Sequence, residues 1–462
     1  MALSTPIDPE SKRSWWTQLT GYQWFVFIIA SLAWFFDCMD QRLFSLARIP
    51  ALKSMLSDPL TVQAVGKNVT ALFLIGWGIG GMIFGVLGDR YGRSKMLTVS
   101  VLTYSLFTCS TFFSHTAWQF AACRCLTGIG IGGVFGLAVA LIAETVTPTA
   151  RSGALGTLQV LSTIGNICAG LIKGGIDALA TGDRLGGQES WRWLFLVGAV
   201  PACLFIFVRK SLKEPEPWLQ LKREGRLPTG SFFSSYSGLL KATRWRRNLV
   251  VGAILAATGV VGLWAIGEYA VDLQRSIFTT FYAGNGYNLA GPTLVTKVNS
   301  TINFVFVLNM IGAALGMSLF TWMCGKLGRK KSFLIGFLAA LVVTSLAYWK
   351  MNSPTDAMWM MPLMGAVQLG PLAGFSIYLP ELFPSRLRST GISFCYNIGR
   401  FAAAGGSFFS SRLSTDVYGK YKQINETLPA RYSAMTMCSI FLIGVVILIW
   451  APETKDKPLP EE

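Results

Sequence analysis

The sequence predicts an all-α membrane protein whose helices cross the bilayer many times. Of its 462 residues, 52% are hydrophobic and only 14% are charged, and the mean hydropathy is +0.48. A soluble protein carries more charge on its surface, so this composition is typical of a polytopic membrane protein. One long polar stretch interrupts the apolar runs near the middle of the chain, which predicts two membrane-embedded halves.

Apolar runs long enough to cross the hydrocarbon core need about 20 residues each in a helix. We expect twelve, at residues 22–46, 68–88, 95–114, 117–143, 153–177, 191–209, 248–271, 300–322, 332–350, 357–379, 389–413 and 433–451. The first run is too long for a signal peptide and is followed by no cleavage site. The sequence therefore predicts twelve transmembrane helices.

The distribution of positive charge predicts the orientation of these helices. Most of the 40 Lys and Arg residues fall in the loops and termini that become cytoplasmic when both termini lie inside. Cytoplasmic loops are enriched in Lys and Arg, so we expect both termini in the cytoplasm. The net charge of +17 sits in short loops, so the expected macromolecular partner is the lipid bilayer and not nucleic acid. Short outer loops favour a bacterial inner membrane, and we expect a monomer.

The long polar stretch covers residues 210–247 and divides the chain into two halves. We expect a six-helix bundle at residues 1–209, a cytoplasmic central loop, and a second bundle at residues 248–462. Membrane transporters are commonly built from two such repeats.

A short glycine-rich basic loop joins the second and third predicted spans, with the sequence Gly85-Val-Leu-Gly-Asp89-Arg90-Tyr-Gly92-Arg93-Ser-Lys95. Glycine permits a sharp turn and a close approach of two helices. Asp89 is expected to cap a helix or to pair with an arginine. The second half carries an echo of this loop at residues 325–331, in which Gly325 replaces the aspartate.

This loop resembles the signature of the major facilitator superfamily. Five further segments resemble the same superfamily: residues 124–133, Glu144 to Gly153, residues 214–218, Tyr378 to Gly391, and residues 452–455. The resemblance covers nearly the whole chain. It implies two pseudo-symmetric six-helix bundles that expose a central site to either side of the membrane in turn.

Two segments resemble one branch of that superfamily, the aromatic-acid and sialate proton symporters. Asp37-Cys-Met-Asp40 followed by Ile49-Pro-Ala-Leu52 resembles their first helix, although Cys38 replaces the usual glycine. Residues 397–406 resemble their eleventh helix, where an arginine fits an anionic substrate. Residues 452–455 instead resemble the ending shared by sugar porters and organic-ion transporters.

Two carboxylates lie one helical turn apart in the first predicted span. At 100° per residue, Asp37, Asp40, Gln41 and Phe44 fall on one face, which predicts a polar stripe toward a wet cavity or another helix. An ionisable group inside the membrane is costly and suggests a function. Mutual repulsion and lost solvation favour the protonated form of such carboxyls. We expect a proton site at Asp37 or Asp40, whereas the alternative is a permanent ion pair with Arg42, Arg48 or Arg124.

Arg400 lies near the middle of the eleventh predicted span. A guanidinium keeps its proton and binds a carboxylate through two hydrogen bonds, so Arg400 is the candidate for capturing a substrate carboxylate. The alternative is a structural partner for carbonyls or a carboxylate. Arg124 lies nearer the outer end of the fourth span. It is expected either to pair with Asp37 or Asp40 until that carboxylate is protonated, or to serve in a gate or in packing.

Further polar and aromatic residues are weaker candidates, because bonding between helices is about equally expected for them. The candidate substrate contacts are Gln41, Phe44, Gln368, Tyr396 and Asn397. The residues assigned to an inner gate are Gly85, Asp89, Arg90, Gly92, Arg93, Glu144, Arg151, Glu381, Arg386 and Arg388. The remaining aromatic side chains are expected to face lipid and the membrane interfaces.

The sequence therefore predicts a secondary transporter that imports a small organic anion together with protons. Two alternatives belong to the same superfamily: a transporter of neutral sugars or polyols, and a facilitator without proton coupling. A non-transporting nutrient sensor is a third alternative. No nucleophile–base set, metal cluster or phosphate-binding loop is evident in the sequence, so we expect neither an enzyme nor a bound cofactor.

Overall fold

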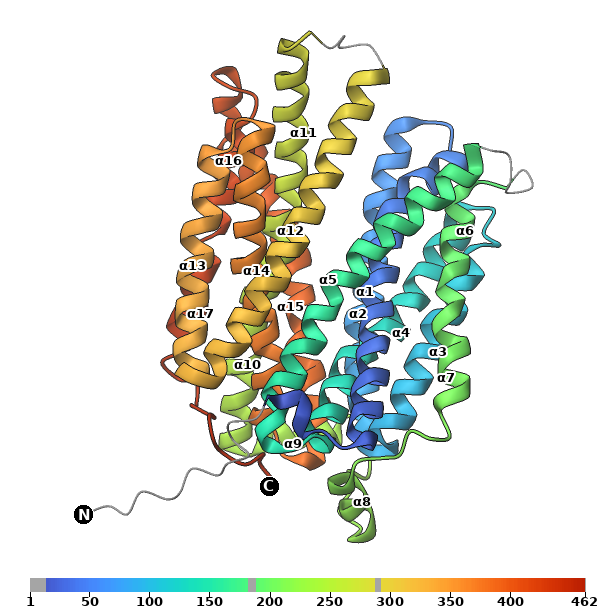
Figure 1. The fold of residues 1–462 in the computed structure, drawn as a ribbon, viewed down its shortest axis with the longest axis vertical. Coiled ribbons are helices and arrows are strands. Elements are labelled where there is room, and N and C mark those ends of the chain that lie inside the picture. Colours follow the sequence, from blue (N-terminus) through green and yellow to red (C-terminus); the bar gives the residue numbers. More distant parts are fainter. Residues whose placement is uncertain (1–13, 182–187, 287–291, 462) are drawn as a thin grey trace.

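A computed structural model describes residues 14–181, 188–286 and 292–461, and the regular secondary structure of these residues is entirely helical. Long helices run side by side in two groups, with α1 to α7 on one side of the molecule and α10 to α17 on the other (Figure 1). The first described turn, Trp15–Gln18, and the C-terminal segment lie at the same end of the molecule (Figure 1). That this end faces the cytoplasm stays a prediction.

The first group begins with α1, whose N-terminus is capped by Thr20 and Gln23 through reciprocal side-chain to backbone hydrogen bonds. The bounds of its helices are α1 Gly21–Met55, α2 Pro59–Tyr91, α3 Arg93–Thr111, α4 Ala117–Thr145, α5 Pro148–Thr181, α6 Ser190–Leu196 and α7 Val200–Val208. A short 3₁₀ turn, Val197–Ala199, joins α6 and α7 into one apolar segment.

The second group contains two π-helical turns, one that joins α10 to α11 and one that follows the end of α15. Its helices are α10 Thr243–Val261, α11 Gly267–Gly284, α12 Pro292–Leu327, α13 Arg329–Lys350, α14 Pro354–Leu382, α15 Arg388–Arg412, α16 Leu428–Met437 and α17 Ile440–Ile447. The π turns are Gly262–Ile266 and Leu413–Val417. Such turns often mark functional segments of a helix.

The chain segment that connects α7 of the first group to α10 of the second is partly helical. It contains α8 Glu216–Arg223 and α9 Ser234–Lys241, and α10 begins at Thr243, inside the predicted loop. The Tyr236 hydroxyl of α9 donates to the Met82 carbonyl at 2.9 Å, so this segment packs against the end of the first group. The domain boundaries at residues 210 and 247 stay a prediction.

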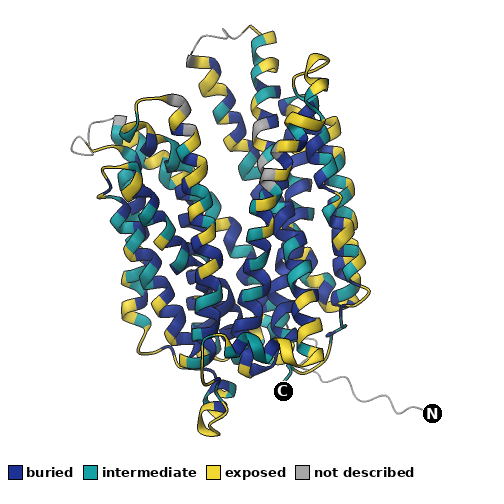
Figure 2. Ribbon diagram, turned by 180° about the vertical axis from the view of Figure 1, so that it is seen from behind, coloured by how far each residue is buried: buried dark blue, intermediate teal, exposed yellow. Residues whose placement is uncertain are grey.

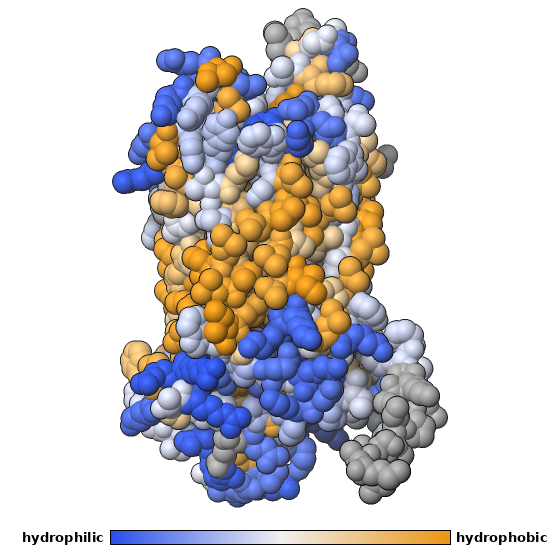
Figure 3. Space-filling view, turned by 90° about the vertical axis from the view of Figure 1, so that its left-hand side faces the viewer, coloured by the Kyte–Doolittle hydropathy of each residue, from blue (hydrophilic) through white to orange (hydrophobic). Residues whose placement is uncertain are grey.

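Ten helical segments of the described residues are long and apolar enough to cross a membrane. Two more, α3 and α15, lie beside them but contain more polar residues. Their polar side chains are buried against other helices, for example Ser100 and Thr108 in α3 and Ser393 and Asn397 in α15. On the face drawn in Figure 3, an apolar band lies between hydrophilic ends. That the chain crosses the membrane twelve times stays a prediction.

Glycines allow α2 and α4 to pack with their backbones in direct contact. A Cβ atom at Gly80 would lie 2.0 Å from the carbonyl oxygen of Ile129, and one at Gly132 would lie 2.3 Å from that of Trp77. Small residues are the usual means of close helix packing in membranes. The first group is therefore built around the α2–α4 contact.

The two groups meet where α15 packs on α2 and α4, and where α12 and α14 pack on α5. Buried residues concentrate where the helices face one another, most densely toward the end that carries the C-terminus (Figure 2). That end is therefore the closed end of the contact between the groups.

We predict that Gly80→Val lowers the free energy of unfolding by about 1–3 kcal/mol, because the new side chain separates α2 from α4. The control is Gly170→Val, since a Cβ at Gly170 meets no atom within 4 Å. Thermal unfolding of both variants in the same detergent measures the difference. Equal melting temperatures would contradict the role of the α2–α4 contact.

Candidate functional site

The two carboxylates of α1 are both buried inside the first group. Asp37 is 0% exposed and Asp40 is 2% exposed. Asp37 Oδ1 accepts a hydrogen bond from Gln41 Nε2 at 2.8 Å. Asp37 Oδ2 and Asp40 Oδ1 have no hydrogen-bond partner among the described residues. Both carboxyl groups therefore keep an oxygen available to a proton.

Arg124 of α4 is the ion-pair partner of Asp40, at 3.4 Å from Oδ2. Its guanidinium also donates to Thr111 Oγ1 at 2.9 Å and to Thr127 Oγ1 at 2.9 Å. These hydroxyl contacts do not depend on the charge of Asp40, so Arg124 stays hydrogen-bonded whether Asp40 is ionised or protonated. Neither threonine is distinguished by a motif in the sequence.

The other two arginines considered as partners make different contacts. The Arg42 guanidinium lies over the Phe306 ring, 3.8 Å from its centroid. Arg48 donates to the Thr70 hydroxyl. Of the ion pairs considered as the alternative to a proton site, the structure contains the one between Asp40 and Arg124, and the proton role of the two aspartates stays a prediction.

Arg400 of α15 is a buried cation, 3% exposed, held by aromatic rings and an amide. Its guanidinium carbon lies 3.6 Å from the Trp77 ring centroid and 4.6 Å from that of Tyr396. One terminal nitrogen donates to Asn397 Oδ1 at 2.7 Å, and Nε has no hydrogen-bond partner within the described part of the chain. No described carboxylate forms an ion pair with Arg400 within 4 Å. Asp37 interacts with it electrostatically at longer range.

An aromatic wall extends from Arg400 into the first group. The Tyr396 ring stacks on Phe135 with centroids 3.8 Å apart, and Trp34 packs on Phe135 at 5.1 Å. On the other side, Trp77 meets Trp264 edge to face at 6.2 Å. Trp34, Trp77 and Phe135 lie inside the protein, whereas the aromatic residues other than Phe44 and Tyr396 are mostly expected to face lipid and the interfaces. Trp34 and Trp77 lie in mid-span, away from the usual aromatic belts, and this position was a usable signal.

The other predicted substrate contacts divide into two sets. Asn397, Tyr396 and Gln41 contact Arg400 or Asp37 directly. Phe44 instead packs on Phe73 and Phe120, 5.8 Å from the Arg124 guanidinium.

Gln368 of α14 is buried away from this set and donates to Thr344 of α13 at 3.3 Å. Its contact is therefore the bond between helices that was the alternative for this residue.

At the closed end, Asp89 of α2 caps the N-terminus of α15 in the opposite group. Its carboxylate accepts from the backbone N–H groups of Ser389 at 3.1 Å and Thr390 at 2.9 Å, and from the Thr390 hydroxyl at 2.6 Å. Arg93 pairs with Asp89 at 3.2 Å. A negative charge is favourable at a helix N-terminus, so Asp89 fastens the two groups together.

Glu144 of α4 forms the second connection between the groups. Its Oε1 accepts from Arg93 Nη2 of its own group at 3.2 Å and from Arg388 Nη1 of α15 at 2.8 Å. All three side chains are fully buried. We call Asp89, Arg93, Glu144 and Arg388 the latch.

In the second repeat, the residues that correspond to the latch connect the two groups less strongly, because the ion pair lies within one group. Arg329 pairs with Glu381 at 2.7 Å within its own group and reaches the other group through the Ser152 hydroxyl at 3.0 Å. Gly325 stands where Asp89 stands in the first repeat, and a Cβ there would meet no atom within 4 Å. No aspartate therefore caps α5 from this position.

Three further residues assigned to the gate, Arg90, Arg151 and Arg386, lie outside the latch. Arg151 donates to the Ala143 carbonyl at 2.8 Å, and Arg90 donates to the Gly230 carbonyl at 3.0 Å. Arg386 is exposed and has no ion pair among the described residues. The sequence assigned it to the gate by its position in the loop, and the structure leaves it outside the latch.

Glu214 and Glu453 make equivalent contacts in the two repeats. Glu214 accepts from the backbone N–H groups of Ser94 and Lys95 at the start of α3, and Glu453 accepts from those of Arg329 and Lys330 at the start of α13. Each capped helix follows a glycine with positive φ, 111° at Gly92 and 92° at Gly328. A side chain at either glycine would be strained and would strike the carboxylate.

The surroundings of these two carboxylates differ in their effect on the pKa. Burial raises the pKa of Glu214, and the N–H donors offset that effect only in part. Burial also acts on Glu453, but four backbone N–H donors outweigh it and lower the pKa of Glu453. Its ionised form therefore stabilises the fold.

We predict that Glu453→Gln lowers the free energy of unfolding by about 1 kcal/mol at pH 7, the usual value of a helix cap. The contribution of the carboxylate is complete above its ordinary pKa of 4.5 and is lost as the pH falls through the lower folded value. Unfolding measured between pH 7 and pH 3 should show the difference shrinking toward acid. Glu426→Gln, at an exposed residue, is the control. A difference independent of pH would contradict the charge-based cap.

Known transporters are similar to this chain over nearly their whole length. A probable 4-methylmuconolactone transporter from Cupriavidus pinatubonensis is 27% identical over 413 residues, covering 89% of this chain and 85% of the relative. A cis,cis-muconate transport protein from Acinetobacter baylyi is 26% identical over 390 residues, covering 84% and 87%. The structure of the proton:xylose symporter XylE superposes with a TM-score of 0.73 at 19% identity, over 95% of this chain and 98% of that one.

The family comparison accounts for both halves of the chain. The sequence profile of the Major Facilitator Superfamily matches residues 24–274 and again residues 275–462. The fold agrees with that of XylE, and the relatives are bacterial transporters of small organic compounds. The chain is therefore a multi-pass membrane transporter, not an enzyme, and belongs to the Major Facilitator Superfamily.

Proposed function

We propose that this transporter imports a small organic carboxylate together with protons. The observation that carries the proposal is Arg400, a buried guanidinium without a carboxylate partner within 4 Å among the described residues. A buried charge without a counter-ion is costly, and an anionic substrate supplies the counter-ion. The similarity to a cis,cis-muconate transport protein supports a carboxylate substrate.

The surroundings of Arg400 favour a flat, unsaturated or aromatic acid. The guanidinium lies over the Trp77 and Tyr396 rings, and its Nε–H has no partner among the described residues and remains for a carboxylate. Phe135 and Trp34 continue the aromatic surface behind Tyr396. Planar carbon skeletons stack on such rings, whereas a polyol would leave its hydroxyls unpaired beside them.

Asp37 is the proposed proton carrier, because Asp40 already has Arg124 as a counter-ion. Ionised Asp37 partly offsets the charge of Arg400 through space. Once Asp37 is protonated, the charge of Arg400 is uncompensated, and the affinity for an anion rises. Proton and substrate binding are thereby coupled, and the coupling is reciprocal.

The transport cycle follows from these contacts. In the present arrangement the latch closes the end that we expect to be cytoplasmic. Protonation of Asp37 and capture of a carboxylate by Arg400 neutralise the buried charges, which lowers the cost of moving the two groups past each other. Opening then requires Asp89 to leave α15 and Arg388 to leave Glu144. One proton entering with one monovalent anion moves no net charge, so the pH gradient drives accumulation and contributes about 1.4 kcal/mol for each unit of pH difference.

We predict that Arg400→Ala abolishes uptake of an organic acid, because the carboxylate loses its counter-ion. The measurement is uptake of a radiolabelled panel containing cis,cis-muconate, benzoate and xylose into proteoliposomes with an inward proton gradient. Arg412→Ala, at the exposed end of the same helix, is the control and should transport normally. Xylose uptake that survives in Arg400→Ala would overturn the carboxylate assignment in favour of a neutral substrate.

We predict that Asp37→Asn loses gradient-driven accumulation but retains exchange of labelled for unlabelled substrate, because asparagine resembles the protonated carboxyl. Accumulation and counterflow are measured in the same proteoliposomes, with Asp416→Asn at an exposed residue as control. If Asp37→Asn accumulates substrate and Asp40→Asn does not, the carrier is Asp40. Accumulation that ignores a collapsed pH gradient in the unmodified protein would contradict proton coupling.

A further inference from the structure

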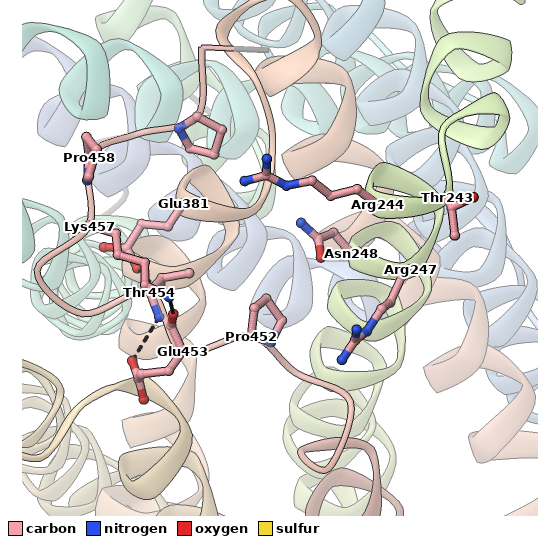
Figure 4. Close-up of a pocket in the computed structure, with 11 residues that line it drawn as sticks. Thr243, Arg244, Arg247, Asn248, Glu381, Pro452, Glu453, Thr454, Lys457 and Pro458 are labelled. Carbon is pink, nitrogen blue, oxygen red and sulfur yellow. Dashed lines mark hydrogen bonds between the residues drawn. The ribbon is translucent and has the colours of Figure 1, made fainter.

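A cavity of about 320 Å³ lies at the closed end, between the start of α10 and residues 452–460, which we call the C-terminal strap. Three cationic side chains line it: Arg244 and Arg247 from α10, and Lys457 from the strap (Figure 4). Arg244 extends from α10 into the cavity, and Asn248 lies beside it (Figure 4). The cavity lies apart from the Arg400 site and plays no part in the proposed transport chemistry.

The positive charge of this cavity is not balanced by its own acidic residues. Glu381 is already paired with Arg329 and accepts from the Thr454 hydroxyl at 2.6 Å, and Glu453 is occupied by the N-terminus of α13. Among the described residues, neither Arg244 nor Arg247 forms an ion pair with a carboxylate. Arg247 donates to the Trp450 carbonyl through Nε at 3.0 Å and through one terminal nitrogen at 2.8 Å. Its other terminal nitrogen and the Arg244 guanidinium remain for an anion.

An apolar groove of about 470 Å³ continues from the cavity along the outer surface of the helices. It runs between α10 and the end of α17, and its lining includes Val250, Ile447 and Trp450. Val250 and Trp450 are each 50% exposed. Thr243 and Arg247 line both the groove and the cavity, so the two spaces adjoin. A basic site that opens onto a membrane-facing apolar groove fits a molecule with an anionic head and a hydrocarbon tail.

The wall of the cavity is part of the closed gate. Asn248 donates to the Leu382 carbonyl at 2.8 Å, next to Glu381, and the strap accepts from Arg388 of the latch through the Pro460 carbonyl at 2.9 Å. The cavity therefore lies beside the latch, on elements of the second group.

We propose that this site binds an anionic phospholipid of the adjoining leaflet, with its phosphate between Arg244 and Arg247 and an acyl chain in the groove. The groove distinguishes a lipid from a free anion, because a soluble phosphate makes no use of it.

The test is binding of phosphatidylglycerol to the purified full chain, followed by native mass spectrometry during titration. Loss of two surface cations should weaken binding by about 25-fold, at about fivefold per charge. The variant is Arg244→Ala/Arg247→Ala. The matched control, Lys210→Ala/Lys241→Ala, removes two exposed cations near the same end but outside the cavity and should bind normally. Thermal unfolding verifies that both variants fold.

Two further arms distinguish a lipid from a free anion. Val250→Trp, which fills the exposed groove, should weaken phosphatidylglycerol binding, and phosphatidylcholine should bind poorly to every variant. Inorganic phosphate at millimolar concentration should not displace the lipid. Full displacement by phosphate, unchanged binding in Val250→Trp, or equal loss in the arginine and lysine variants would each overturn the proposal.

Discussion

The close contact between α2 and α15 determines both the candidate substrate site and the latch. Glycines on α2 make room for α15: a Cβ at Gly81 would lie 1.9 Å from Asn397 Nδ2, and one at Gly85 would lie 2.7 Å from Ser393 Cβ. The same contact places Trp77 over Arg400 and Asp89 at the N-terminus of α15. Because both sites share these two helices, separating them at one end must disturb the other, which is the mechanical basis for coupling substrate binding to opening.

The two repeats contribute unequally to the closed end. The first repeat fastens the groups through a carboxylate on a helix N-terminus and a buried Glu144–Arg388 pair. The second repeat has Gly325 in place of the aspartate and crosses between groups through a hydroxyl of Ser152. Charge-assisted bonds are roughly twice as strong as neutral ones, so we expect the α2–α15 side to resist opening more than the α5–α12 side.

The family, the helical architecture and the pairing of an α1 carboxylate with an arginine could be predicted from the sequence, because hydropathy, charge and loop motifs are local signals. The burial of Asp37, Asp40 and Arg400 followed from their positions within apolar runs. The assembly of the aromatic wall could not be predicted, since Trp77, Phe135 and Tyr396 come from three helices and meet only through packing. Likewise, Glu214 and Glu453 were noticed as parts of motifs, but their capping of α3 and α13 depends on contacts more than 100 residues apart.

The central claim is that a proton on Asp37 and an anion on Arg400 bind together. Its most direct test is the number of protons taken up when the purified protein binds its organic acid, measured by calorimetry in buffers of different ionisation enthalpy. The account predicts net proton uptake with the unmodified protein near neutral pH and none with Asp37→Asn, which should still bind the acid. Binding without proton uptake in the unmodified protein, across the pH range in which it transports, would contradict the account.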